Sequence, residues 1–207
     1  MNVDRILGWV ITALVKVLYY PKVYFEDGAR KEPRIEGPAI LVCNHTSHLD
    51  GPIVNTTLKG PQIRPLAAKD RFEQKGFGFF LRHTGCIPID RQHADTSWIH
   101  ESMKVLSEGG CVSIYPEGRH GTHRQQLPFH SGVSMLAVMA RVPVVMVYID
   151  GPHKMFHRTG LMIGEPFTIE VPATGLSADY VDAQTRLLEE KMRDLMQKYI
   201  EAEKRIL

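Results

Sequence analysis

Short, wholly apolar segments that alternate with helical patterns constrain the fold more than any other feature of this sequence. The clearest is Ala39–Cys43, an apolar run typical of a strand buried on both faces of a sheet. Strands that alternate with helices predict an α/β domain with a mostly parallel central sheet flanked by helices. The other expected strands lie at 23–26, 87–89, 111–115 and 142–149, and the expected helices between them at 97–107 and 131–140.

Both ends of the chain carry further helical patterns. From Ile6 to Tyr20 nearly every residue is apolar, and the few polar or small residues recur every three or four positions, so an amphipathic helix is expected. The segment after Ser177 predicts a long amphipathic C-terminal helix with Ser177 as its N-cap. We therefore divide the chain into an interfacial helix at 1–22 and one folded domain at 23–207.

The N-terminal helix has the character of a segment that lies in a membrane surface. It would reach about 23 Å, which is less than the roughly 30 Å hydrocarbon core of a bilayer. Trp9, Tyr19 and Tyr20 are residue types that favour the membrane interface, and Pro21 ends the helix. A signal peptide would need a small-residue cleavage site, which does not follow. The remaining alternative is a helix docked on the protein's own core.

Charge and cysteine content restrict the partners and the compartment. The formal net charge of +2 gives no bulk electrostatic basis for binding nucleic acid, so no nucleic-acid partner is expected. Cys43, Cys86 and Cys111 are odd in number and widely spaced, which argues against a disulfide framework. Together with the N-terminal helix, these features predict a peripheral membrane protein on the cytoplasmic face, with the membrane surface as a partner.

Polar residues with catalytic potential follow the first buried strand directly. The segment from Asn44 to Asp50 places His45 at the carboxyl end of the strand and Asp50 at the start of a helix. Asp50 can accept a hydrogen bond from one imidazole nitrogen of His45, which leaves the other nitrogen as a general base. Two alternatives remain open. Asp50 before Gly51 and Pro52 suits a helix N-cap, and His45 with His48 suits a metal site, although no third ligand is placed nearby.

Four ordered segments share a family resemblance. They resemble the four sequence blocks of the glycerolipid acyltransferases, the lysophosphatidate and glycerol-3-phosphate acyltransferases, and the resemblance runs from about Gly37 to Pro166. It also includes Lys69 and Gly132 between the blocks. The segments are Asn44–Asp50, Gly85–Arg91, Tyr115–Gly121 and Val142–Val147.

The resemblance implies an O-acyltransferase without a covalent enzyme intermediate. A fatty acyl group would move from acyl-CoA or acyl carrier protein to the hydroxyl of a lysophospholipid such as 1-acyl-glycerol-3-phosphate, with His45 as general base and Asp50 orienting it. No cofactor and no metal are implied. Lipid substrates, and acyl carrier protein as a donor, are the implied partners. The resemblance implies five acceptor-binding residues, Lys69, Arg91, Glu117, Gly118 and Arg119. Arg91 would meet the acceptor phosphate, and Glu117 and Gly118 would belong to the acceptor or the acyl-donor site.

The third block departs from the family pattern. The position of the usual arginine holds His120, with Arg119 one residue earlier, and His130 stands where many members have a lysine. Either Arg119 and Arg124 restore the charge, or the acceptor carries no phosphate monoester. His120, His123 and His130 also leave a metal cluster open as an alternative.

Two other functions remain compatible with these residues. A catalytically silent lipid-binding protein on the same fold would bind lysolipid or acyl thioester without turnover. An acyl-thioesterase would use His45 to activate water, and would release free fatty acid.

Overall fold

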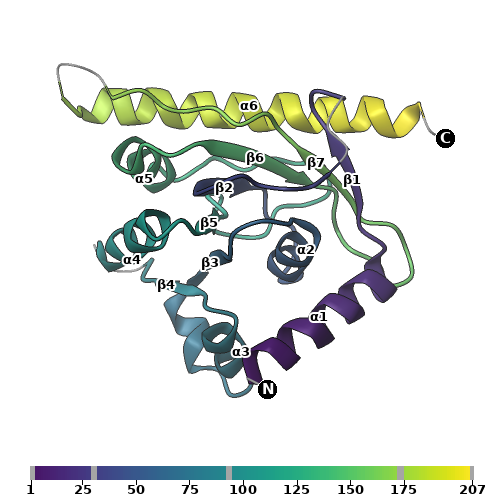
Figure 1. Cartoon of the computed structure of the whole chain (residues 1–207). Helices are drawn as coiled ribbons and strands as arrows, with labels where there is room; N and C mark the ends of the chain where they lie inside the picture. The colour runs from purple at the N-terminus through teal and green to yellow at the C-terminus, as the bar shows by residue number, and fades with distance from the viewer. Residues whose placement is uncertain (1–2, 29–31, 92–94, 172–174, 206–207) are drawn as a thin grey trace.

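The computed structural model describes residues 3–28, 32–91, 95–171 and 175–205, with only the backbone described for residues 3–7 and 9. The described strands form a seven-stranded sheet of order β1-β7-β6-β2-β5-β3-β4 (Figure 1). Neighbouring strands are parallel except for the antiparallel pair β6 and β7. The strands are β1 Lys22–Phe25, β2 Ala39–Cys43, β3 Ile63–Ala68, β4 Ile87–Ile89, β5 Cys111–Ile114, β6 Val144–Ile149 and β7 Gly160–Ile163.

Helices cover both faces of the sheet, which confirms the predicted α/β class. Helices α4, α5 and α6 pack on one face, and α1 and α2 pack on the other (Figure 1). A short 3-10 helix, η1, and helix α3 follow β3 at one edge of the sheet. The helices are α1 Val3–Tyr19, α2 Asp50–Thr57, η1 Lys69–Glu73, α3 Phe77–His83, α4 Ser97–Ser107, α5 Gly132–Ala140 and α6 Ala178–Lys204.

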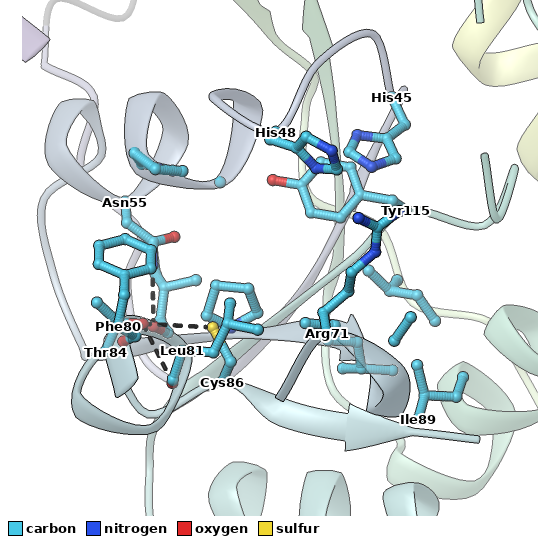
Figure 2. Close-up of a pocket in the computed structure, with 18 of the residues that line it drawn as sticks. His45, His48, Asn55, Arg71, Phe80, Leu81, Thr84, Cys86, Ile89 and Tyr115 are labelled. Atoms are coloured by element: carbon cyan, nitrogen blue, oxygen red, sulfur yellow. Dashed lines mark hydrogen bonds between the residues drawn. The ribbon is translucent and has the colours of Figure 1, made fainter. Parts of the chain in front are cut away.

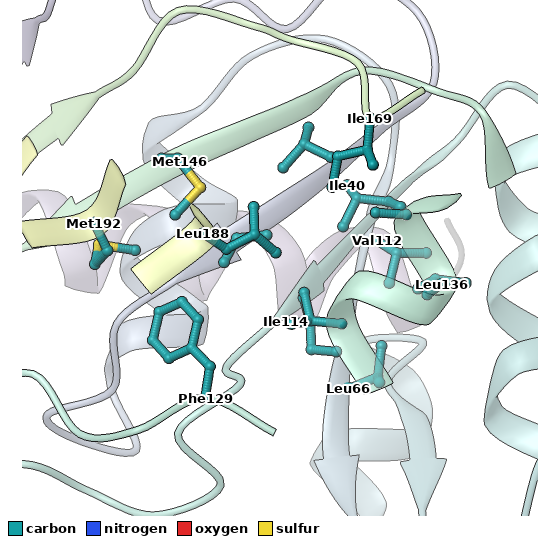
Figure 3. Close-up of a cluster of buried hydrophobic side chains, with 14 of the residues drawn as sticks. Ile40, Leu66, Val112, Ile114, Phe129, Leu136, Met146, Ile169, Leu188 and Met192 are labelled. Atoms are coloured by element: carbon teal, nitrogen blue, oxygen red, sulfur yellow. The ribbon is translucent and has the colours of Figure 1, made fainter. Parts of the chain in front are cut away.

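Strand β2 lies at the centre of the sheet and contributes to the core on both sides. Ile40 and Val42 join the cluster under α5 and α6, which Figure 3 shows, while Leu41 and Cys43 join the cluster under α1 and α2. All of its residues are buried, as the apolar run predicts. Burial on both faces fixes the strand, and so fixes the point at which His45 leaves the sheet.

The C-terminal helix α6 matches its sequence pattern. The Ser177 side chain accepts a hydrogen bond from the Tyr180 backbone N–H at 3.2 Å, which confirms the predicted N-cap. Leu188, Met192 and Leu195 are buried against the sheet, and Figure 3 shows Leu188 and Met192 in that layer. The helix therefore closes one face of the core.

The N-terminal helix α1 is partly docked and partly exposed. Val15 and Tyr19 are buried in the core cluster that also contains residues of α2, whereas Val10, Leu14 and Val17 are exposed. Within the described residues, no helix has both the length and the apolar character that a membrane crossing requires. The side chains of Arg5 and Trp9 lie outside the described residues.

The strands β3 and β7 were not predicted from the sequence, and β5 and β6 are shorter than expected. β3 contains Arg64 and Pro65, so it lacks a continuous apolar run, and the four-residue apolar run of β7 carries no signal that sets it apart in the sequence. β6 begins at Val144 instead of residue 142, because Pro143 has no N–H to donate to a neighbouring strand. β5 ends at Ile114.

Candidate active site

The carboxyl ends of β2, β3 and β5 open into a cavity of about 950 Å³. His45, which follows β2, and Tyr115, which follows β5, lie at one end of it (Figure 2). Phe80, Leu81 and Cys86 lie at the other end (Figure 2). The cavity thus joins a polar end to an apolar interior, as a site for an amphiphilic molecule requires.

His45 and Asp50 form a hydrogen-bonded pair at the polar end. The distance from His45 Nδ1 to Asp50 Oδ2 is 2.8 Å, and the Asp50 side chain is fully buried whereas that of His45 is 17% exposed. An ionised carboxylate accepts, so Nδ1 carries the proton and Nε2 is left with a free lone pair. This is the arrangement of a general base oriented by an acid.

Asp50 also organises the loop that leads to it. The backbone N–H groups of Thr46 and Ser47 donate to Asp50 Oδ2 at 2.6 and 2.9 Å, and the Thr46 hydroxyl donates to Oδ1 at 3.1 Å. The N-cap of α2 is Leu49, and its side chain caps nothing, so Asp50 folds the preceding loop instead of capping the helix. Burial alone would raise the pKa of Asp50, but hydrogen bonds from His153 and His45 hold it well below its usual range.

A second imidazole contacts the same carboxylate. His153, in the loop after β6, places Nε2 2.5 Å from Asp50 Oδ1, and its side chain is fully buried. Its Nδ1 lies 3.4 Å from the Thr159 hydroxyl. His153 is not recognisable as a site residue from the sequence, because 103 residues separate it from Asp50 and no motif marks it.

Asn44 fixes the strand end from which His45 projects. Its amide nitrogen donates to the Ile149 carbonyl at 2.9 Å, and its side-chain oxygen accepts from the Ile149 N–H at 2.7 Å. The side chain therefore continues the pairing of β2 with β6 beyond the backbone ladder. This reciprocal pair restricts the direction in which the chain leaves the sheet.

Three further aromatic side chains surround the His45 ring or extend its cluster. The ring centroids of Tyr115 and His120 lie 4.6 and 4.3 Å from that of His45, and His48 lies 4.4 Å from His120. The pKa of His48 is lowered by burial and by the charge of Arg71, and that of His120 by burial and by the neighbouring His45 and His48. Burial and these neighbouring charges therefore favour the neutral form of both rings.

Among the expected acceptor-binding residues, Arg91, Gly118 and Arg119 line the cavity. Arg91 Nη1 donates to the carbonyl oxygen of Gly118, which brings the second and third blocks together. Lys69 is not among the lining residues; its Nζ lies 3.5 Å from Asp90. Arg71, two positions later in η1, lines the cavity, and its charge acts on His48 and His120 (Figure 2).

Glu117 lies behind the cavity wall and not in it. Its side chain is not among the lining residues, and the residue is only 3% exposed. Neither carboxylate oxygen has a hydrogen bond of good geometry within the described ranges. Burial raises the pKa of Glu117 to about 7, against the opposing effect of the backbone N–H groups of His45 and Leu127.

The structure shows where the residues that depart from the family pattern in and after the third block lie. His120 and His130 line the cavity, and a Cβ added at Gly118, where φ is +67°, would lie 2.9 Å from His130 Nε2. Gly118 therefore supplies both a left-handed backbone and the room that His130 needs. Arg124 pairs with Asp150 at 3.2 Å and with Glu203 at 2.5 Å, so it does not restore charge in the cavity.

Metal binding by histidines was an alternative that the sequence left open. Within the parts of the chain that the structure describes, no three His, Cys, Asp or Glu side chains are grouped to hold a metal ion. His123, which the sequence grouped with His120 and His130, bonds instead to the carbonyl oxygen of Gly151. Cys43, Cys86 and Cys111 are free and buried, and burial raises the pKa of each thiol, which disfavours the reactive thiolate.

Comparisons with known proteins agree with this architecture. The chain is 29% identical over 164 residues to a 1-acyl-sn-glycerol-3-phosphate acyltransferase of Bacillus subtilis (strain 168), covering 77% of this chain and 81% of that protein. It is 26% identical to the human 1-acyl-sn-glycerol-3-phosphate acyltransferase beta over 197 residues, 91% of this chain and 69% of the relative.

A solved structure shares the fold, and a family model matches the chain. The crystal structure of the 1-acyl-sn-glycerophosphate acyltransferase of Thermotoga maritima superposes with a TM-score of 0.65 at 20% identity, covering 94% of this chain and 80% of that one. The family model described as Acyltransferase matches residues 21–150, which include His45, Asp50 and the four blocks. These findings confirm the resemblance to glycerolipid acyltransferases, and the chain belongs to the acyltransferase family.

Proposed function

We propose that this protein transfers a fatty acyl group from a thioester, acyl-CoA or acyl carrier protein, to the hydroxyl of a lysophospholipid such as 1-acyl-glycerol-3-phosphate. The names of the relatives support this acceptor class. The single observation that carries the chemistry is the 2.8 Å contact between His45 and Asp50 at the polar end of a cavity.

In the proposed mechanism His45 acts as the general base. Its Nε2 takes the proton of the acceptor hydroxyl as that oxygen attacks the thioester carbonyl, and Asp50 stabilises the imidazolium that forms. The tetrahedral intermediate then collapses, the carbon–sulfur bond breaks, and the imidazolium returns its proton to the departing thiolate. A thioester is already activated, so the transfer uses no cofactor and no covalent enzyme intermediate.

The acceptor phosphate is assigned to the cationic wall of the cavity. Arg91 and Arg119 line it, and Arg71 adds a third guanidinium that the sequence analysis did not single out. A guanidinium offers a planar fork of donors that matches phosphate oxygens. Gly118 contributes by accepting a hydrogen bond from Arg91. Lys69 and Glu117 lie outside the cavity wall. Lys69 acts through its ion pair with Asp90, and Glu117 lies next to the backbone N–H of His45.

Both substrates are amphiphiles, so the enzyme is proposed to work as a peripheral protein on the cytoplasmic membrane face. Helix α1 supports this because Val10, Leu14 and Val17 are exposed while Ile11 and Thr12, on another side of the helix, line the cavity. A lipid that leaves the bilayer beside α1 would have a short path to His45. Helix α1 then serves as the interfacial anchor.

The test is acyl transfer by the purified full chain. One labelled acyl thioester is incubated with a panel of phosphorylated and neutral lysolipid acceptors, and the products are resolved by mass spectrometry. We expect esterified lysophospholipid from the wild type and none from His45→Ala, with folding checked by circular dichroism. Free fatty acid without ester would instead indicate a thioesterase, and binding without thiol release would indicate a silent lipid-binding protein. Either result overturns the proposal, as does full turnover by His45→Ala.

A further inference from the structure

Large exposed apolar side chains occur on helix α1 and also in the loop between β6 and β7. On α1 and just after it, Val10, Leu14, Val17 and Tyr20 are 49% to 57% exposed. Met155 and Phe156, in the loop between β6 and β7, are 59% and 67% exposed, more than any other large apolar residue described. Side chains of this kind are expected to be covered when they gather at one place.

Backbone hydrogen bonds join this loop to the end of α1. The Phe156 N–H donates to the Leu18 carbonyl at 2.5 Å, and the Thr159 N–H donates to the Tyr19 carbonyl at 2.9 Å. The loop thus satisfies carbonyl groups that a helix end leaves without partners. Figure 1 shows the loop between β6 and β7 reaching the C-terminal end of α1. The exposed residues of the loop and of α1 therefore belong to one region of the surface.

Phe156 combines a highly exposed ring with an unusual backbone conformation. Its φ is +63°, in the left-handed region that bulky residues rarely adopt. An exposed aromatic residue on a strained backbone has no evident value for the stability of the monomer. It is the arrangement expected of a side chain that inserts into a lipid bilayer.

The charge of the two segments matches an anionic surface. Residues 3–25 and 151–164 contain Arg5, Lys16, Lys22, Lys154 and Arg158 against a single acidic residue, Asp4, although the whole chain has a net charge of only +2. The rest of the chain is therefore net acidic. Basic residues beside exposed apolar ones attract anionic lipid head groups while the apolar side chains enter the acyl region.

We propose that the loop 152–159 is a second membrane-contact element, in which Met155 and Phe156 insert beside α1 and Lys154 and Arg158 contact anionic lipid head groups. The occupant of this surface is a bilayer that contains anionic lipid. This inference rests on the proposed function in taking the substrates to be lipids. It adds a contact element outside the N-terminal helix. Lys154, Met155, Phe156 and Arg158, the residues assigned to the bilayer, do not line the cavity, whereas the neighbouring His153 side chain is buried against Asp50.

The test compares the binding of full-length variants to vesicles. Wild type and Met155→Ser/Phe156→Asn are titrated with vesicles of phosphatidylcholine and phosphatidylglycerol; asparagine tolerates the left-handed backbone at position 156. Vesicle partitioning is expected to fall roughly tenfold or more, because two large apolar side chains no longer enter the bilayer. The matched control is Met139→Ser/Leu187→Ser, which removes two exposed apolar side chains from α5 and α6 and should bind as wild type.

A second pair of variants tests the charge. Lys154→Glu/Arg158→Glu should bind vesicles with phosphatidylglycerol more weakly and lose the salt dependence that Lys104→Glu on α4 retains. Acyl transfer between water-soluble, short-chain substrates should be unchanged in every variant, so loss of vesicle binding is separable from failure of the proposed function. Wild-type vesicle binding by Met155→Ser/Phe156→Asn overturns the proposal. So does a change of oligomeric state in that variant with vesicle binding intact, since a second copy of the chain would then cover the surface.

Discussion

His153 Nε2 contacts Asp50 Oδ1 at 2.5 Å, while Asp50 Oδ2 faces His45 at 2.8 Å, so one buried carboxylate holds two imidazoles. The two backbone N–H groups of Thr46 and Ser47 complete its surroundings. The carboxylate is therefore held from both sides, which restricts the rotation of the group that orients the proposed base. His153 lies in the loop after β6. In the sheet, β6 and β5 flank β2 on opposite sides.

Replacing His153 tests whether this second imidazole positions Asp50. His153→Leu removes a hydrogen bond to a charged group, which is worth about 1.5–3 kcal/mol, so kcat should fall roughly ten- to a hundredfold. His153→Gln keeps a side-chain N–H and should recover much of the rate. Steady-state kinetics on both folded variants check this, and an unchanged kcat in His153→Leu would show that His153 only fills space.

Glu117 should make the stability of the protein fall as the pH rises. Its pKa is about 7 in the folded protein against an ordinary value of 4.5, so between these values the folded state binds more protons than the unfolded state. Folding stability therefore declines across that window, by roughly 3 kcal/mol in all. Glu117→Gln removes this contribution, and denaturant unfolding at pH 5 and pH 8 measures it.

The lowered pKa values of His48 and His120 act in the opposite direction, because these groups bind fewer protons in the folded state below their ordinary range. The difference between wild type and Glu117→Gln isolates the carboxyl group from them. If the difference in unfolding free energy between Glu117→Gln and wild type is the same at pH 8 as at pH 5, the Glu117 carboxylate is stabilised by partners that the structure does not show.

Tyr115 should tolerate the loss of its hydroxyl. Its ring packs against His45, but the hydroxyl is buried and makes no hydrogen bond of good geometry with the described residues. Tyr115→Phe should therefore leave stability unchanged or raise it by about 1 kcal/mol, with activity retained. Tyr148→Phe is the matched control, because the Tyr148 hydroxyl donates to Asp150 at 3.0 Å. Thermal unfolding should show a lower Tm for Tyr148→Phe alone, and equal losses would contradict this account.

The sequence predicted the parts of the site that are close together along the chain. The apolar run of β2 placed His45 at a strand end, and the five-residue spacing to Asp50 allowed the pair to form. His153 was not predictable, because its contact depends on how a loop far along the chain folds back over Asp50. The cap interpretation of Asp50 failed for a related reason: the same residue types suit a helix start and a loop folded around a carboxylate.

The strands show the same limit. β2, β4 and β5 are apolar enough to be recognised locally, but β3 interrupts its apolar residues with Arg64 and Pro65. It is a strand because it pairs with β5 and β4, where Leu66 packs into the core. Tertiary pairing thus decides what local pattern leaves open. The division at residue 22 stays a prediction, although β1 begins there.

The cationic wall gives the last prediction, which separates Arg91 from Lys69. The family resemblance assigns both to the acceptor, but Arg91 lines the cavity whereas Lys69 is 60% exposed and pairs with Asp90. Arg91→Ala should raise KM for 1-acyl-glycerol-3-phosphate about tenfold or more, since a charge-assisted hydrogen bond is worth about 1.5–3 kcal/mol. Lys69→Ala should have a much smaller effect, because an exposed ion pair contributes only about 0–1 kcal/mol. A neutral acceptor of the same chain length provides the control, since its KM does not depend on phosphate contacts. Equal KM increases for Arg91→Ala and Lys69→Ala would mean that η1 moves on binding to bring Lys69 into the cavity. An increase that also appears with the neutral acceptor would place the effect in the Arg91 contact to Gly118 instead of in phosphate recognition.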